Sequence, residues 1–333
     1  MSSGTQETVV GMTAGSVDSS DRDGLYGPGS EAWRLNREAA MLIAGGPRAL
    51  LLQIAHPLVA EGVEQHSDFR ADPWRRLAAT LRSYLTIVYG TTTVARAEIA
   101  RLERVHRRVG GPVRDPAAVV ATGAISYSGR DPELAMWVHA TLVDSTMVAY
   151  DAWIEPLSEA RRAAFYAETR QIAVAFGIAP ARIPADLAAF EAYLERMLAP
   201  DGPVHPTPTA RALAEAVLHP PLAPLAAWAP PRLAGPLGAI LGMVPGPLVD
   251  WTMWPAVSLL PARVRAEFGI PWDRRREIVS AWLSAGIRFW RPRLPPGFRQ
   301  MPPASAADRR VSVAASLPVD RRVAAAGLPG HPG

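Results

Sequence analysis

The chain of 333 residues carries 35 basic residues, all of them arginine, 31 acidic residues and no cysteine, so its formal net charge is +4. Without cysteine the chain has no disulfide, cysteine nucleophile, thiolate-bound haem or cysteine-ligated iron–sulfur or zinc site, and without lysine it has no Schiff-base chemistry and no Walker A loop. Because charges of both signs are mixed along the chain and no basic stripe is interleaved with aromatic residues, we expect no nucleic-acid partner.

The two ends of the chain read as tails. Residues 1–24 are polar and lack both the basic start and the apolar core of a secretory signal, so we expect a disordered tail on a cytoplasmic protein. Residues 303–333 are expected to form a second tail, in which VSVAASL could make a short ordered stretch. No internal repeat or composition break divides residues 25–302, which predicts a single domain.

Between the tails the apolar residues follow helical periodicity and nowhere alternate with polar ones, which predicts an all-α fold. Aspartate followed by proline marks helix starts at Asp72, Asp115 and Asp131, because aspartate caps a helix and proline suits its first position. The predicted helices span residues 31–44, 47–63, 73–89, 93–109, 131–152, 158–176, 185–198 and 207–217, and further helices are expected from about Pro261 to Phe289.

The segment 220–261 is apolar and has only two charged residues, Arg232 and Asp250. A helix that spans a bilayer needs about 20 unbroken apolar residues, and prolines interrupt this segment repeatedly. Short buried helices are therefore expected rather than a membrane anchor. The alternative is an apolar substrate entrance or a face that rests on a membrane surface.

The helix around His106 predicts an inward-facing imidazole. Ile99, Leu102 and His106 share one stripe at helical spacing, whereas arginines occupy the rest of the circumference. A buried imidazole needs a hydrogen-bonding neighbour or a metal. The residues alone leave open whether His106 is a core histidine or a metal ligand.

Other histidines offer further candidates. His139 stands in a helix that is apolar on nearly every side, so we expect it to be buried, either in a network of polar neighbours or near a cofactor. His66 also lies in helical context. His56 precedes a proline and is expected at a helix end or in a loop.

Several metal and catalytic motifs can be tested against the sequence. Glu103 and His106 have the Glu-x-x-His spacing of diiron carboxylate bundles, which need two such pairs, and no second pair occurs. The motifs of zinc proteases, serine hydrolases and dinucleotide-binding folds are absent. A haem b held by one imidazole in an apolar helical pocket remains compatible with the residues.

Such a haem would need polar groups on its distal side. Arg76 and Thr80 are four residues apart on one helix face and could hydrogen-bond dioxygen or a peroxide. The alternative is a surface arginine and a threonine on a helix face.

Three separated stretches, LLLQIAHPLVAEGVEQHSDFRADPWRRLAATL, LERVHRRVGG and DPELAMWVHATLVDS, resemble the MpaB-type oxygenase family, which includes the rubber oxygenase known as latex clearing protein. The resemblance covers about residues 30–300, including LPARVRAEFGIPWD and RPRLPPGFR near the end. It implies an all-helical fold around a b-type haem with a histidine ligand. It also implies oxidative cleavage of carbon–carbon double bonds in isoprenoid chains as one reaction of the family.

The resemblance also assigns residues. His106 matches the proximal haem ligand, and Arg76 and Thr80 match distal-pocket positions. Ala79 stands where the rubber oxygenase has a lysine, so no lysine can close the distal iron site by coordination here. The family's other histidine-bearing motifs contain His139, His66 and His56, which we assign to the pocket or its surroundings, with His139 as the alternative axial ligand.

The predicted function is that of a haem b oxygenase or peroxygenase that uses dioxygen and acts on an apolar, terpenoid or alkene substrate. Two alternatives stay open at this point. One is a haem-binding sensor or carrier without turnover, and the other is a cofactor-free helical protein whose histidines are structural.

Overall fold

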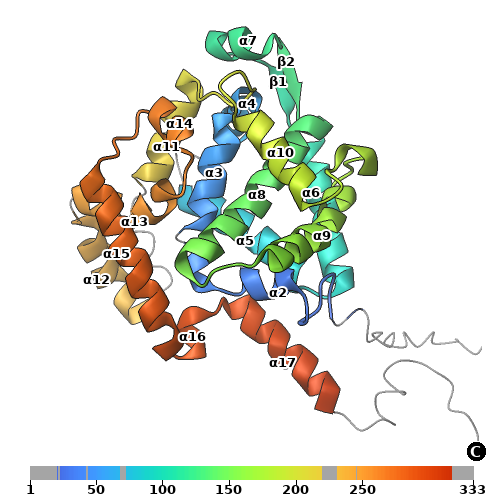
Figure 1. Ribbon diagram of the computed structural model, residues 1–333, viewed down its shortest axis with the longest axis vertical. Helices are drawn as coiled ribbons and strands as arrows, with labels where there is room; N and C mark the ends of the chain where they lie inside the picture. The colour runs from blue at the N-terminus through green and yellow to red at the C-terminus, as the bar shows by residue number, and fades with distance from the viewer. Residues whose placement is uncertain are drawn as a thin grey trace, which may run out of the picture.

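The computed structural model describes residues 21, 23–42, 44–67, 73–219, 231–244 and 246–316. Helices form nearly all of its regular structure, which confirms the predicted all-α class (Figure 1). In chain order the helices are α2 (Glu31–Asn36), α3 (Gly45–Ala55), α4 (Pro57–His66), α5 (Pro73–Tyr89), α6 (Thr92–His106), α7 (Pro116–Thr122), α8 (Pro132–Trp153), α9 (Glu159–Ala175), α10 (Leu187–Leu198), α11 (Pro208–Leu218), α12 (Pro231–Gly242), α13 (Gly246–Ser258), α14 (Ala262–Glu267), α15 (Arg274–Trp290), α16 (Pro296–Arg299) and α17 (Pro302–Ser316).

Local sequence signals set several of these helix boundaries. Asp115 and Asp131 cap α7 and α8 as predicted, accepting hydrogen bonds from the backbone N–H groups two residues on, both at 2.9 Å. Asp72 lies outside the described residues. The helix predicted over 47–63 is instead two helices, because the backbone at His56 is extended (φ −80°, ψ 121°) ahead of Pro57.

A short antiparallel hairpin, which the periodicity did not predict, joins α6 to α8. Its strands β1 (Gly110–Pro112) and β2 (Ser126–Ser128) pair Gly111 with Tyr127. Strands of three residues are too short to show an alternating pattern. The hairpin and α7 project from the top of the molecule in Figure 1.

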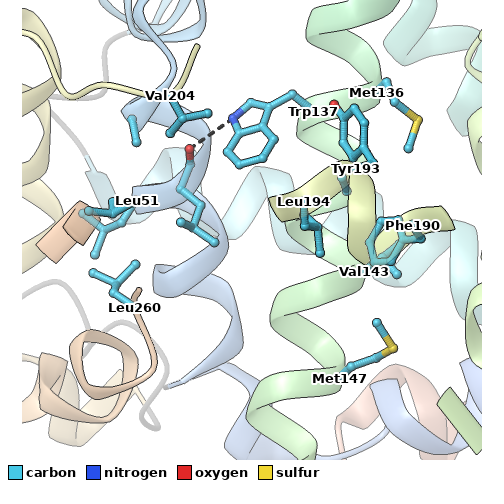
Figure 2. Packing of buried hydrophobic residues seen from close by; sticks show 14 of the residues in the cluster. Leu51, Met136, Trp137, Val143, Met147, Phe190, Tyr193, Leu194, Val204 and Leu260 are labelled. Carbon is cyan, nitrogen blue, oxygen red and sulfur yellow. Dashed lines mark hydrogen bonds between the residues drawn. The ribbon is translucent and has the colours of Figure 1, made fainter. Parts of the chain in front are cut away.

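The core forms where α8 packs against α3 and α10. Trp137 of α8 is fully buried and donates its indole N–H to the carbonyl oxygen of Leu52 in α3 at 3.1 Å. Figure 2 shows Phe190 and Leu194 of α10 filling the space beside α8. The side chains of α8 are buried around most of its circumference, as its apolar sequence predicted.

Among the described residues no single helix is long and apolar enough to cross a membrane. One bent pair, Ala39–Ala55 with Pro57–His66, passes the test of length and composition together, with an angle of 106° between its halves.

A buried ion pair fixes α3 to α8. Arg48 is 4% exposed, and its guanidinium lies 2.7 Å from both the Asp144 carboxylate and the Ser145 hydroxyl. It also donates to the carbonyl oxygen of Leu259 at 2.8 Å, just after α13. These contacts satisfy the buried cation, and they join three segments far apart in the sequence.

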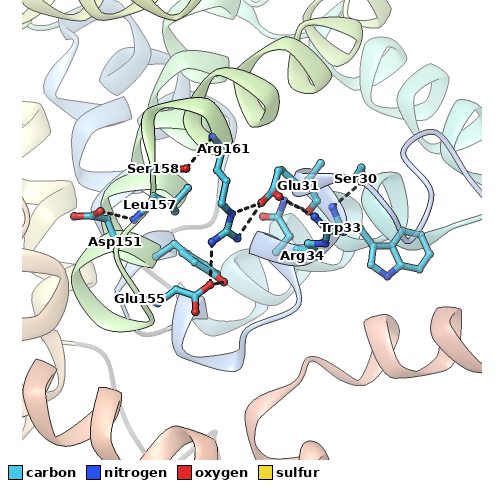
Figure 3. A network of polar contacts seen from close by, with 12 residues as sticks. Ser30, Glu31, Trp33, Arg34, Asp151, Glu155, Leu157, Ser158 and Arg161 are labelled. Carbon is cyan, nitrogen blue, oxygen red and sulfur yellow. Dashed lines mark hydrogen bonds and ion pairs between the residues drawn. The ribbon is translucent and has the colours of Figure 1, made fainter.

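A second polar network holds α2 against α9 and the end of α8 (Figure 3). Arg161 of α9 donates to the Glu31 carboxylate at 3.0 Å and to Glu155 at 2.9 Å. The hydroxyl of Tyr150 in α8 donates to the same Glu155 at 2.9 Å. The Glu168 carboxylate accepts from the backbone N–H groups of residues 31 and 32, where a helix start attracts negative charge.

Ordered structure extends beyond the expected domain at both ends. The expected C-terminal tail begins as α17, whose Ala304 and Ala307 are buried against Trp33. Asp308 accepts a hydrogen bond from the indole N–H of Trp33 at 2.9 Å. At the other end, Asp21 accepts from the backbone N–H of Thr93 at 2.6 Å. These contacts are long-range, which is why composition did not predict them.

Replacing Arg48 with alanine leaves the Asp144 carboxylate, 15% exposed, without its cation. We expect Arg48→Ala to lower the free energy of unfolding by about 3–5 kcal/mol in urea denaturation. The matched control is Arg34→Ala, because Arg34 is 51% exposed in its pair with Glu31. For that variant the free energy of unfolding should fall by less than about 1 kcal/mol. Equal losses for the two variants would contradict the assigned role of Arg48.

Candidate active site at the hairpin end of the bundle

The candidate site lies where α6 ends and α8 begins. Both helix ends meet the base of the hairpin, since α6 ends at His106 just before β1, and α8 starts at Pro132 just after β2. The carbonyl oxygen of His106 lies against Gly129, where any side chain would clash with it. His139 is seven residues into α8, about 10 Å along the helix axis from Pro132.

Helix α5 reaches the same end of the bundle. Its last residue, Tyr89, donates its hydroxyl to the carbonyl oxygen of Trp33 in α2 at 2.9 Å, at the end opposite the hairpin. Because α6 packs antiparallel to α5 after a short turn, the first turns of α5 lie beside the last turns of α6 (Figure 1). Thr80 is therefore brought toward His106.

Tyr84 sets α5 against α8. Burial raises the pKa of Tyr84 to about 12, although hydrogen bonds with Thr146 and Asn36 lower it. Its hydroxyl donates to the Asn36 side chain at 2.8 Å. Thr80 lies one turn before Tyr84, and His139 lies two turns before Thr146 on the same face of α8. The two helices thus bring Thr80 and His139 to the same end of the molecule.

His139 is buried, as predicted, with 8% of its surface exposed. Its Nε2 atom is buried and has no hydrogen-bond partner among the described residues. Burial lowers the pKa of His139 to about 4, so the ring is neutral at pH 7. A buried polar atom without a partner costs about 1–3 kcal/mol, which marks Nε2 as a position where a ligand atom would be stabilising.

The polar network expected around His139 does not form. Asp144 and Ser145, which follow it on α8, contact Arg48 instead. The Thr141 hydroxyl donates to the carbonyl oxygen of Val138 at 2.7 Å.

The prediction that His106 is buried is wrong. Its place on the inward stripe of α6 is correct, because Ala95 and Ile99 on that stripe are buried, but His106 itself is exposed. It is the last residue of α6, where the chain leaves the bundle for the hairpin, and the Phe176 ring lies 6.3 Å from its own ring centre.

Thr80 on α5, like His106 on α6, lies on the inward face of its helix and is nevertheless exposed. Ile87, two turns later on the same face, is buried, whereas Thr80 is exposed. Ala79, at the position of the rubber oxygenase lysine, is exposed as well. The inward faces of α5 and α6 therefore both open to solvent at the end of the bundle that holds His139. We call this end of the bundle, where α5 carries Thr80, α6 carries His106 and α8 carries His139, the hairpin-end opening.

Two other predicted features give a different result. Arg76 lies one turn before Thr80 in α5, but its side chain is outside the described part of the chain. Glu103, 53% exposed, lies 3.8 Å from Arg107 on the outer face of α6. Within the described residues no three histidine or acidic side chains could jointly hold a metal ion, so these residues do not form a diiron carboxylate site.

His56 and His66 have structural partners of their own. The Nδ1 atom of His56 caps α4 by accepting from the backbone N–H of Leu58 at 3.3 Å, and burial lowers the pKa of His56 to about 4. The exposed His66 has its Nε2 atom 3.2 Å from the backbone of Gly110, which joins the end of α4 to the hairpin. Their assignment to a cofactor pocket stays a prediction.

Sequence reasoning missed Glu61, the residue that fixes this end of the bundle. Its carboxylate is 2% exposed and accepts from the backbone N–H groups of Arg114 and Asp115 at 2.9 and 3.1 Å. It thereby holds the chain between the hairpin and α7 against α4. No local signal predicts this, because its partners are backbone groups more than fifty residues away.

A family model described as "ER-bound oxygenase mpaB/B'/Rubber oxygenase, catalytic domain" matches residues 33–289. The chain belongs to this family. The match spans α5, α6 and α8, the helices that carry Thr80, His106 and His139, and it confirms the resemblance carried by the sequence motifs. Family membership makes the protein an oxygenase, an enzyme that takes dioxygen and a small-molecule substrate. Neither a curated protein nor a solved structure matches the chain.

The buried, neutral state of His139 predicts a pH dependence of stability. Between pH 7 and 5 the unfolded chain protonates this histidine at its ordinary pKa of 6.5, whereas the folded chain, with a pKa of about 4, does not. The unfolded state then binds more protons, so stability falls as the pH falls. In cofactor-free protein, the free energy of unfolding falls between pH 7 and pH 5. We expect this fall to be about 2 kcal/mol smaller for His139→Gln than for the wild type.

The control is His219→Gln, which replaces a half-exposed histidine at the end of α11 and should keep the wild-type slope. Urea unfolding at each pH measures the difference. Identical slopes for wild type and His139→Gln would show that His139 is charged or solvated in the folded protein.

Proposed function

We propose that this oxygenase uses haem b and acts on an apolar substrate of the terpenoid or alkene class. The observation that carries the proposal is the unpartnered Nε2 atom of His139, a buried and neutral imidazole nitrogen at the hairpin-end opening. A histidine imidazole is one of the side chains that bind haem iron in proteins, and this chain has no cysteine to offer instead. The residues present therefore fit the cofactor.

His106 would hold the haem iron, with His139 as the alternative ligand. His106 is on the inward stripe of α6 and is exposed at the opening, so its ring can approach a cofactor without rearrangement of the core. His106 is also the residue that matches the proximal haem ligand of the family. If His106 is the ligand, His139 retains a free ring nitrogen that can hydrogen-bond a cofactor or substrate atom.

The helix surface around His106 suits the rest of a haem. Arg107 and Arg108 follow His106 directly and are exposed. Guanidinium groups pair strongly with carboxylates, so these arginines would bind the two propionates. Phe176, at the end of α9, would offer an aromatic contact to the macrocycle.

The chemistry supplied by the bound group would be the activation of dioxygen or a peroxide. The chain's own residues would orient the reacting species. Thr80 carries a hydroxyl that can donate a hydrogen bond at the opening, and Arg76 would add a cation one turn away. The apolar surface of α8 beside His139 would keep water out and hold an apolar substrate.

Two further expectations stay predictions. The first is a substrate entrance or membrane-resting face across residues 220–261, of which the structure describes α12, α13 and the residues next to them. The expectation of short buried helices in this segment is wrong for α12, because Ile240 in this helix and Met243 just after it are 59% and 74% exposed. The second is the cytoplasmic location inferred from the N-terminus.

Haem content tests the cofactor and its ligand. Protein purified from cells supplied with a haem precursor should give a b-type pyridine haemochrome. We expect His106→Ala to keep less than about a tenth of the wild-type haem, because removing even an indirect support of a ligand costs 10–100-fold in affinity. The control His219→Ala should retain it all.

A colourless wild type that also fails to take up added haemin would contradict the cofactor proposal. Full occupancy in His106→Ala, with loss in His139→Ala, would move the axial position to His139.

Oxygen uptake tests turnover and the role of Thr80. With terpenoid aldehydes or alkenes as substrates, the haem-loaded protein should consume dioxygen steadily. Thr80→Val should slow the uptake by about 100-fold with unchanged haem content, because one well-placed donor is worth that much in a transition state. Tight ligand binding without uptake by the wild type would favour a haem carrier instead.

A further inference from the structure

An exposed aromatic face lies on α13 and α15, away from the hairpin-end opening. Every exposed tryptophan or phenylalanine among the described residues is found on these two helices. We call the following residues the aromatic face: Trp251 (51% exposed), Ile278 (47%), Trp282 (76%), Phe289 (55%) and Trp290 (61%).

The spacing on α15 explains this exposure. Ile278, Trp282 and Phe289 recur at intervals of four and seven residues, so they form one stripe along the helix. The opposite side of α15 attaches it to the core, where Ser284 donates to the carbonyl oxygen of Ala152 at 3.1 Å and Ile287 packs beside Trp153. The stripe therefore points away from the core, and α15 runs along the left edge of the molecule in Figure 1.

Trp254 connects the two helices of the face. Its ring centre lies 5.4 Å from that of Trp251, and the Arg276 guanidinium of α15 lies 5.8 Å from it. Trp254 thus places the aromatic residues of α13 beside the first turn of α15. Proteins seldom expose several large apolar side chains on neighbouring helices unless these bind something.

The charges beside the face identify its partner. Between Arg274 and Arg299 the chain carries seven arginines and one acidic residue, Glu277. Four of these arginines, at positions 274, 275, 288 and 293, are exposed and have no ion-pair partner within the described residues. Tryptophan and phenylalanine enter the boundary between lipid headgroups and acyl chains, and arginine reaches the headgroup phosphates.

We infer that the aromatic face docks the protein on the surface of a bilayer that contains anionic phospholipids. A second copy of the chain fits less well, because a symmetric dimer through this face would bring its arginines against their own copies. The docking surface centres on α15 and so extends past the segment 220–261. The inference does not depend on haem binding.

Vesicle co-sedimentation of the full chain tests the inference. We expect the protein to bind vesicles of phosphatidylcholine mixed with phosphatidylglycerol, and to bind vesicles of phosphatidylcholine alone at least tenfold more weakly. Raising the salt from about 0.1 to about 0.5 M should weaken binding to the anionic vesicles, because salt screens the arginines.

Two variants separate the apolar and charged contributions. Trp282→Ala should weaken binding to the anionic vesicles by about tenfold, since interfacial binding scales with the apolar area buried. The double variant Arg274→Ser with Arg275→Ser should weaken it by about 30-fold, since each interfacial arginine contributes about fivefold. The matched control is Val120→Ser, which removes an apolar side chain that is 87% exposed on α7 and should change nothing.

Circular dichroism and thermal unfolding confirm that each variant folds, and light scattering reports the oligomeric state. Equal binding by the wild type and both α15 variants, or no binding to anionic vesicles, would overturn the inference. So would a dimer in solution that Trp282→Ala dissociates, because the face would then be covered by a second copy.

Discussion

The burial of α8 is the constraint on which the rest of the structure depends. This helix of 22 residues has buried side chains around most of its circumference. A polar group on such a helix destabilises the fold unless a partner satisfies it. Asp144 and Ser145 are satisfied by Arg48, and the Thr141 hydroxyl is satisfied within the helix. Two buried side-chain atoms of α8 have no hydrogen-bond partner among the described residues, the Nε2 atom of His139 and the indole nitrogen of Trp153 at the last residue of the helix.

The site follows from how the ends of α8 are held. Its C-terminal end is fixed through Tyr150, Glu155 and Arg161 to α2, while its N-terminal end leaves the hairpin whose base also receives the last turn of α6. The core therefore closes at the α2 end and opens at the hairpin end. Inward-facing residues of α5 and α6 become exposed there, beside a neutral imidazole.

The sequence predicted features that depend on short-range chemistry. Aspartate before proline defined the starts of α7 and α8, and helical periodicity placed His139 in the core and His106 on the inward stripe of α6. The exposure of His106 could not be predicted in the same way, because periodicity tells which face a residue occupies but not where neighbouring helices stop covering that face. The break between α3 and α4 has a local cause, Pro57. The apolar pattern runs through this proline, and for that reason one helix was predicted where there are two.

Long-range contacts account for the other differences. Alanine-rich α17 has little apolar area of its own, and it is held by Trp33 and by the Asp308 carboxylate. Glu61 satisfies backbone groups that no motif connects to it. The aromatic face likewise depends on which side of α15 meets the core, since the sequence places apolar residues on both sides of that helix.

The most direct test of this account is the position of iron in crystals of the haemin-loaded protein, located by anomalous scattering at the iron absorption edge. The account predicts one iron peak at the hairpin-end opening, between α5, α6 and α8, within bonding distance of the Nε2 atom of His106. An iron peak bonded to His139 would keep the site and change the ligand. A peak elsewhere in the molecule, or none in crystals that contain haem by absorbance, would contradict the account.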